Sequence, residues 1–175
     1  MRILLTALVL AFANISMGQN VAFEKDNFPN DKDGYKRAVK NIKEGDRIFE
    51  EDRRASFNLA IPYYTAANEF NPDNAELNYK LGVCYLFSPQ KRKSLPFLTK
   101  AFELDSQIDS YNIHYLLGWA HQLNSNWDEA IEEFERQLTV LTNSGGEPEE
   151  FQKVQKRLEE VKHGKEFEVT PVRVW

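Results

Sequence analysis

The stretch "YKLGVCYLFS", from Tyr79 to Ser88, places one glycine, Gly82, inside an apolar segment with helical spacing. A glycine inside a helix costs about 1 kcal/mol relative to alanine, so its presence there needs a packing reason. A second helix passing close to Gly82 would supply that reason, because no side chain would hold the two backbones apart. If close packing is the reason, similar glycines are expected wherever the same contact recurs.

The glycine recurs along the chain at a nearly constant period. Gly45 precedes Gly82 by 37 residues, and Gly118 follows it by 36. A small residue follows each glycine in turn, and these residues are Ala60, Ser94 and Ala130. A large apolar residue lies four positions beyond each of them, at Tyr64, Leu98 and Phe134. A period of this length predicts stacked units that share one small motif of secondary structure.

Each unit is expected to fold as two helices. In the second unit Asn74 is a good N-cap residue for the first helix, which Ser88 and Pro89 would end. Pro62 and Pro96 lie 34 residues apart, and proline is tolerated in the first turn of a helix. These two prolines are therefore predicted to mark the beginnings of the second helices of units one and two.

A pair of short helices cannot bury both of its faces, so neighbouring pairs are expected to stack. Small residues would lie where the helices cross, because they let two backbones approach closely. The predicted contact joins the glycines of the first helices, Gly45, Gly82 and Gly118, to the small residues of the second helices, Ala60, Ser94 and Ala130.

The joint pattern resembles the tetratricopeptide repeat over about Tyr35 to Leu141. The matching residues are Gly45, Ala60, Tyr64, Ala67 and Pro72 in unit one, Gly82, Tyr85 and Ser94 in unit two, and Leu117, Gly118, Ala130 and Phe134 in unit three. Ser106 and Thr142 replace the closing proline of the family, and His121 replaces its aromatic residue. The resemblance implies an all-α fold, an α-solenoid of three helix-turn-helix repeats within 35–146, at about 35–73, 74–108 and 109–142.

A further helix is expected after the repeats. Gly145 and Gly146 are typical of a helix end, and Pro148 suits the first turn of the next helix. An apolar stripe then follows, formed by Phe151, Val154, Leu158 and Val161. The pattern predicts a capping helix over 147–164 that ends at Gly164 and covers the exposed end of the stack.

The first residues, 1–18, have the order of a secretory signal peptide. Arg2 precedes a short apolar run, and cleavage is predicted between Gly18 and Gln19. The alternative, a membrane anchor, is disfavoured because a bilayer span needs about 20 apolar residues. The mature protein would then be exported, would contain no transmembrane span, and would begin with an extension over 19–34.

The C-terminal tail, 165–175, changes its hydrophobic period. Phe167 and Val169 alternate with charged residues, which predicts a strand. The order of signal peptide, helical repeats and a short "TPVRV" strand resembles the N-terminal part of exported Gram-negative proteins whose repeats precede a β-propeller and an outer-membrane-protein-A-like peptidoglycan-binding domain. This resemblance implies a periplasmic or outer-membrane-associated protein, either a stand-alone relative or the first part of a longer chain.

Composition and motifs exclude several kinds of site. The net charge of −5 argues against nucleic acid, which needs a basic face. Cys84 is the single cysteine, so it forms no internal disulfide and is expected to be a buried apolar residue. His114 and His121 lie seven residues apart, too far to chelate one ion without a third ligand. Without a phosphate-binding loop or nucleophile motif, no enzymatic activity, catalytic residue, metal, cofactor or small-molecule substrate is predicted.

Protein binding is the function that the pattern favours. Stacked helix pairs form a curved surface whose concave side is lined by the first helices. The partner-binding residues predicted there are Phe49, Tyr79, Lys80, Phe87, Asn112, Tyr115, Trp119 and Gln122. Tyr79, Tyr115 and Trp119 are expected to be exposed anchors. Val83 and Leu116 on the same side fit at least as well into the core between the helices.

The expected partner is a protein or peptide of the cell envelope. Some members of the family grip a carboxylate terminus with Lys, Asn and Arg side chains on this surface. The corresponding positions here are Ile42, Asp46, Lys80, Asn112 and Leu116. They carry little positive charge, so the acidic tail of a chaperone is not the expected partner. The alternative function is that of a structural adaptor whose strand-like tail pairs with an adjacent β domain.

Overall fold

The structure is a computed structural model that describes residues 18–50 and 57–169. All regular structure in these two ranges is helical, so the predicted all-α class is confirmed for them. The α-helices are α1 (Lys32–Glu50), α2 (Phe57–Phe70), α3 (Ala75–Leu86), α4 (Ser94–Leu104), α5 (Ile113–Leu123), α6 (Trp127–Ser144) and α7 (Pro148–Val169). The short 3-10 helix η1 (Lys25–Asn27) precedes α1, and the 3-10 helix η3 (Lys91–Lys93) lies in the connection between α3 and α4.

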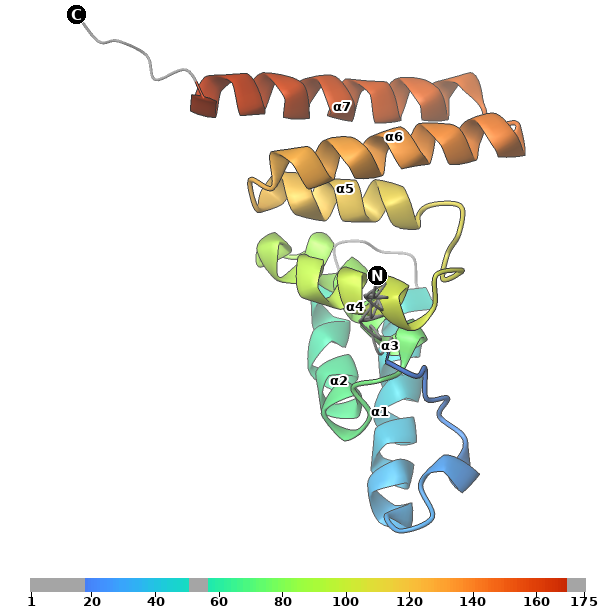
Figure 1. The fold of residues 1–175 in the computed structure, drawn as a ribbon. Coiled ribbons are helices and arrows are strands. Elements are labelled where there is room, and N and C mark those ends of the chain that lie inside the picture. Colours follow the sequence, from blue (N-terminus) through green and yellow to red (C-terminus); the bar gives the residue numbers. More distant parts are fainter. Residues whose placement is uncertain (1–17, 51–56, 170–175) are drawn as a thin grey trace, which may run out of the picture.

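The helices pack in the order in which they follow one another along the chain (Figure 1). The most extensive contacts join α1 to α2, α3 to α4, and α5 to α6, so the helices form three successive pairs. Helix α2 also packs on α3, and α7 covers α6, whereas α4 and α5 share a smaller contact. The result is an elongated stack with α1 and α2 at one end and α7 at the other.

The periodic glycines lie at the closest approaches within these pairs. Gly45, Gly82 and Gly118 are all buried. A β-carbon added to them would lie 2.5 Å from the Tyr64 ring, 2.6 Å from Leu98 and 2.9 Å from the Phe134 ring, respectively. The nearest atoms thus belong to the large residues, which lie one helical turn after the small residues Ala60, Ser94 and Ala130 of the predicted contact. The missing side chain leaves a shallow hole, and the large apolar residue of the partner helix fills it.

The small residues of the second helices are packed as tightly as the glycines. Ala60, Ser94 and Ala130 are each 0% exposed. Since each precedes the large residue by one helical turn, it lies on the same face of its helix. A small side chain at this place lets the second helix lie close enough for its large residue to reach the glycine.

Several predicted helix ends are confirmed. Asn74 is the N-cap of α3, and its side-chain oxygen accepts a hydrogen bond from the Leu77 N–H at 2.9 Å. Helix α6 ends at Ser144, and Gly145 is its C-cap, with a φ of 71° that glycine readily adopts. The Gly146 N–H donates to the Leu141 carbonyl at 2.8 Å, and α7 then begins at Pro148.

One proline lies elsewhere than predicted. Pro96 is in the first turn of α4, as expected, but Pro62 lies inside α2. A proline there leaves the carbonyl of Asn58 without its usual helical donor. Both Pro62 and Asn58 are exposed, so water can satisfy this carbonyl and the helix continues.

The capping helix is longer than predicted, and the strand prediction for its end is wrong. Helix α7 continues to Val169, so 165–169 is helical. Gly164 therefore lies inside α7 and does not end it. A β-carbon there would lie 3.0 Å from the ring of Trp127, so the glycine permits close packing of α7 on α6. The His163 and Phe167 rings lie 4.6 Å apart, one helical turn from each other, which supports this last part of the helix. The rest of the predicted tail, 170–175, lies outside the described residues.

The extension before α1 is held against the α2–α3 connection. The Val21 N–H donates to the Asp73 carbonyl at 2.7 Å, and the Val21 carbonyl accepts from the side-chain amides of Asn71 and Asn74, both at 2.9 Å. Phe23 lies 6.4 Å from Phe70, centroid to centroid. The extension is thus an ordered part of the fold.

The predicted signal peptide, apart from its last residue, lies outside the described residues. None of the helices in 18–50 and 57–169 is both long enough and apolar enough to cross a membrane.

Candidate functional site

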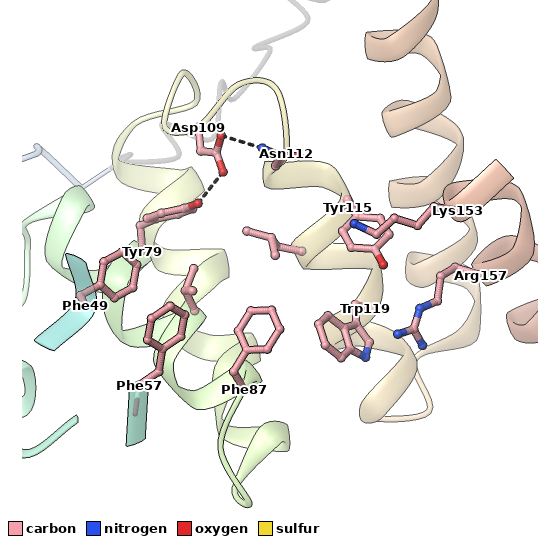
Figure 2. A pocket seen from close by; sticks show the side chains of 12 residues that line it. Phe49, Phe57, Tyr79, Phe87, Asp109, Asn112, Tyr115, Trp119, Lys153 and Arg157 are labelled. Carbon is pink, nitrogen blue, oxygen red and sulfur yellow. Dashed lines mark hydrogen bonds between the residues drawn. The ribbon is translucent and has the colours of Figure 1, made fainter. Parts of the chain in front are cut away.

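A hollow of about 550 Å³ lies where α3, α5 and α7 face one another (Figure 2). We call it the aromatic groove, and its lining residues are Phe49, Phe57, Tyr79, Val83, Phe87, Asp109, Asn112, Tyr115, Leu116, Trp119, Lys153 and Arg157. They come from α1, α2, α3, α5 and α7 and from the connection before α5. Since they are far apart in the sequence, only the stacking of the helix pairs brings them together.

Aromatic rings form a continuous row through the groove. Phe49 stacks on Phe57 with 4.8 Å between the ring centroids. Phe57 meets Phe87 edge to face at 5.9 Å, and Phe87 meets Trp119 in the same way at 5.4 Å. Edge-to-face contacts of this kind favour defined ring orientations. The row therefore offers an apolar surface of set shape, with Trp119 at the end nearest α7.

A polar contact closes the opposite side of the groove. The Tyr79 hydroxyl donates a hydrogen bond to the Asp109 carboxylate, which also accepts one from the Asn112 side chain at 3.3 Å. Burial, and then this hydrogen bond, raise the pKa of Tyr79 well above its ordinary value. Asp109 has a φ of 40°, a conformation that residues other than glycine seldom adopt. The bond joins α3 to the start of α5 across the groove.

Helix α7 supplies two cations to the groove. The Lys153 ammonium lies 4.2 Å from the centroid of the Tyr115 ring, and the Arg157 guanidinium lies 4.8 Å from that of Trp119. These are cation–π contacts, which hold a positive charge over the face of a ring. Arg157 also donates a hydrogen bond to the side-chain oxygen of Gln122 at 3.3 Å. The wall formed by α7 is therefore positively charged.

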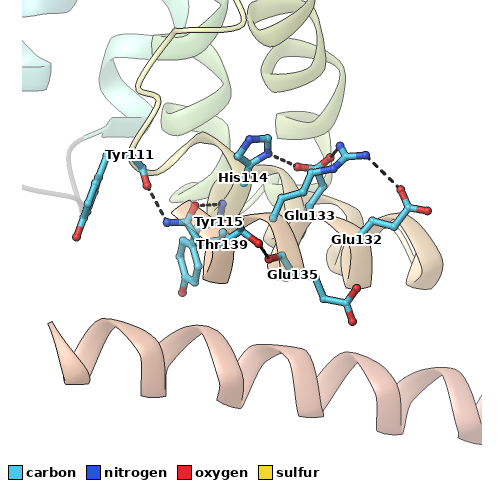
Figure 3. A network of polar contacts seen from close by, with 9 residues as sticks. Tyr111, His114, Tyr115, Glu132, Glu133, Glu135 and Thr139 are labelled. Atoms are coloured by element: carbon cyan, nitrogen blue, oxygen red, sulfur yellow. Dashed lines mark hydrogen bonds and ion pairs between the residues drawn. The ribbon is translucent and has the colours of Figure 1, made fainter. Parts of the chain in front are cut away.

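Polar contacts join α5 to α6, the helix on which α7 packs (Figure 3). The Gln137 side chain donates to the Tyr111 carbonyl at 2.7 Å and accepts from the Tyr115 N–H at 3.0 Å. Glu133 pairs with His114 at 2.7 Å and with Arg136 at 2.5 Å. Gln137 is 2% exposed, and its side-chain oxygen satisfies a backbone N–H in the first turn of α5 that has no partner within the helix. These bonds set the position of Tyr115 relative to α6, on which α7 packs.

A second, smaller hollow of about 240 Å³ lies closer to the N-terminus. We call it the N-terminal hollow, and it is lined by Ala22, Phe23, Ile42, Asp46, Asn74, Glu76, Leu77 and Lys80. The Lys80 ammonium lies 2.8 Å from Asp46 and 2.7 Å from Glu76. Burial lowers the pKa of Lys80, but the two carboxylates outweigh it, so the pKa is raised. The Asp46 carboxylate also accepts a hydrogen bond from the Tyr64 hydroxyl at 2.8 Å.

The predicted binding residues divide between these two hollows. Those that line the aromatic groove are Phe49, Tyr79, Phe87, Asn112, Tyr115 and Trp119. Lys80 lines the N-terminal hollow, and Gln122 stands at the edge of the groove and contacts Arg157. Tyr115 is 9% exposed, so the expectation that it is an exposed anchor is wrong, because Lys153 and the α5–α6 packing cover it. Tyr79 and Trp119 are half-buried.

Four groove residues were not predicted: Phe57, Asp109, Lys153 and Arg157. Lys153 and Arg157 are spaced by one helical turn and border the apolar stripe of α7. That spacing is a usable sequence signal, since residues beside a buried stripe lie at the edge of the interface. Asp109 and Phe57 carried no comparable signal.

Other reactive side chains gather into no site in the described part of the chain. Cys84 is buried, as predicted, and burial raises the pKa of its thiol to about 12. Such a thiol stays protonated and unreactive near neutral pH. No group of three or more His, Cys, Asp or Glu side chains in 18–50 and 57–169 is arranged to hold a metal ion.

No family model matches this chain, and no curated protein matches it either.

Proposed function

We propose that this protein is a non-enzymatic interaction module that binds a segment of another protein in the aromatic groove. The main support for this proposal is the row of four aromatic rings, which extends across three successive helix pairs. Half-buried aromatic side chains in a preformed hollow are the usual anchors of protein interfaces. A hollow of about 550 Å³ is large enough for one or two side chains of a partner.

The architecture that we propose for this module is an α-solenoid of three tetratricopeptide-like repeats, capped by α7. The contact of each periodic glycine with the large residue of its partner helix supports this assignment. So does the packing of each helix on its neighbours in sequence. In this proposal the first helices of the repeats, α1, α3 and α5, provide the concave side.

The place of action in the proposal is the cell envelope of a Gram-negative bacterium, in the periplasm or at the outer membrane. The charge, apolar run and small residues of 1–18 support export by a cleaved signal peptide. Mass spectrometry of the protein from cell envelopes would then give a chain that begins at Gln19. A chain that retains Met1 and Arg2 in the cytosolic fraction would contradict this part of the proposal.

The binding site is tested by removing its half-buried anchor. We expect Trp119→Ala to abolish capture of the partner from envelope extracts while the helical circular dichroism is unchanged. Tyr63→Ala is the matched control, because Tyr63 is 37% exposed on α2 and lies outside the groove. Equal capture by wild-type protein and the Trp119 variant would refute the groove assignment.

The alternative, a structural adaptor that docks through its tail, has lost part of its support. Residues 165–169 belong to α7 and therefore do not offer a strand for pairing. Deleting 170–175 separates the two functions. Capture that survives the deletion supports the groove, and capture that is lost with it supports the adaptor.

A further inference from the structure

The positive wall of the aromatic groove is only partly neutralised within the protein. Among the described residues, the ion pairs of α7 join Arg157 to Glu160 at 3.6 Å and Lys165 to Asp128, and none includes Lys153. Glu150, one turn before Lys153, has its pKa lowered mainly by hydrogen bonds from Tyr111 and Glu147 and least by the nearby charge of Lys153. It accepts hydrogen bonds from the Tyr111 hydroxyl at 2.6 Å and from the Glu147 N–H at 2.9 Å. The Lys153 ammonium is therefore available to an external acceptor.

Arg157 keeps most of its hydrogen-bonding capacity as well. A guanidinium has five N–H donors, and the Arg157 group uses its face on Trp119 and one nitrogen on Gln122. The distance of 3.6 Å to Glu160 is longer than that of a hydrogen-bonded ion pair. Stacking on Trp119 holds the guanidinium plane in place. The Arg157 side chain therefore loses less conformational entropy when it binds a carboxylate through two hydrogen bonds.

From this geometry, and resting on the proposed function of the groove, we infer that the bound segment is acidic. An apolar side chain of the partner lies against Phe87 and Trp119, and an adjacent Asp or Glu carboxylate accepts hydrogen bonds from Lys153 and Arg157. Charge complementarity identifies this occupant, since the two cations lie one turn apart on α7 at the edge of the aromatic groove. The carboxylate in the lining, Asp109, is already hydrogen-bonded to Tyr79 and Asn112.

The net charge of the chain sharpens this selectivity. The protein carries −5 overall, so its net charge opposes an acidic partner, and the two cations of this wall provide a local attraction at the groove. Exposed charges interact over about 10 Å at 0.1 M salt and about 3 Å at 1 M. Binding of an acidic segment should therefore weaken as salt is added, whereas binding through the rings alone should not.

The test uses three sets of synthetic peptides of equal length and apolar content. In each set one central aromatic or leucine residue is flanked by Asp and Glu, by Asn and Gln, or by Lys and Arg. Fluorescence anisotropy measures binding to the whole protein and to its Lys153→Gln and Arg157→Gln variants. Lys156→Gln is the matched control, since it removes the same charge from an exposed position on α7 that does not line the groove.

We expect the acidic set to bind at least tenfold more tightly than the neutral set. Lys153→Gln and Arg157→Gln should each weaken the acidic set about tenfold, and Lys156→Gln should change it less than twofold. Equal binding of the acidic and neutral sets, or no effect of Lys153→Gln, would overturn the acidic assignment and leave the groove as a binding site. If no set binds, the proposed function itself fails.

A second copy of the chain is the competing occupant, because its own acidic segments could enter the groove. Sedimentation of the protein alone distinguishes the two cases. We expect a monomer at concentrations where the acidic peptides bind. A dimer that is lost in Lys153→Glu would assign the groove to self-association and overturn the inference of an external partner.

Discussion

The two hollows use their charged and aromatic residues in opposite ways. In the N-terminal hollow Lys80 is held by two carboxylates of the same chain, and Phe23 of the extension fills part of the space. In the aromatic groove Lys153 faces a ring and lacks a carboxylate partner among the described residues. A lysine beside a hollow can thus stabilise the fold in one case and stand without an ion pair among the described residues in the other.

The largest effect on stability is expected from opening the N-terminal hollow. Phe23→Ala removes a ring that lies 5.9 Å from Phe28 and 6.4 Å from Phe70. Truncation of a buried phenylalanine costs about 3–5 kcal/mol, and a half-buried ring should cost about 2 kcal/mol. Urea denaturation measures this loss. Phe167→Ala is the control, since Phe167 is 61% exposed, and an equal cost for both variants would show that the extension is not part of the packed fold.

The next effect concerns the ion pairs of the same hollow. Asp46→Ala leaves the Tyr64 hydroxyl and the Lys80 ammonium without their shared acceptor. Leaving buried donors unsatisfied costs about 1–3 kcal/mol. Glu76→Ala should cost clearly less, because the Glu76 side chain is 67% exposed and Lys80 keeps Asp46. Thermal unfolding of both variants would contradict this account if Glu76→Ala were the more damaging change.

A smaller effect on stability is expected at Gly82 in α3, the helix that lines both hollows. Gly82→Ala gains about 1 kcal/mol of helix propensity but overpacks the contact with Leu98, which costs about 1–3 kcal/mol. The clash should win by about 1 kcal/mol, because the added carbon would also lie 3.1 Å from the Leu98 backbone nitrogen. Adding Leu98→Val should restore part of the loss. A Gly82→Ala protein more stable than wild type would show that the glycine is not needed for close packing.

The smallest effect on stability is expected at the groove. Lys153→Gln removes one exposed cation–π contact, worth about 0.5–1 kcal/mol, and no ion pair among the described residues. Thermal unfolding should therefore change little, in contrast with Asp46→Ala. Breaking a buried polar contact costs about 1–3 kcal/mol. A loss of stability of about 2 kcal/mol in Lys153→Gln would therefore show that Lys153 is a structural residue.

The sequence predicted the parts of this fold that repeat or that follow local rules. The glycine period identified the three close contacts, and the types of Asn74 and Gly145 predicted their cap roles correctly. The sequence did not indicate that the large residue one turn further on would come nearest to each glycine, because periodicity gives a face of a helix but not the depth to which a neighbour approaches. The strand predicted around Phe167 failed because two alternating residues are too few to override an established helix.

The candidate site was predicted only where it lies on the repeat. Tyr79, Phe87 and Trp119 followed from their positions in first helices. Lys153 and Arg157 did not, because charged residues on a terminal helix are usually solvated, and only the packing of α7 against α6 brings them over the rings. Contacts between elements so far apart in the sequence depend on tertiary geometry that a local pattern does not contain.

The most direct test of the account compares the two hollows in living cells. A benzophenone amino acid at Asn112 would face the aromatic groove, and one at Ala22 would face the N-terminal hollow. After irradiation, the account predicts a discrete adduct with another envelope protein from position 112, lost in the Lys153→Glu background, and none from position 22. Equal adducts from both positions, or an adduct at 112 that is indifferent to Lys153→Glu, would contradict it.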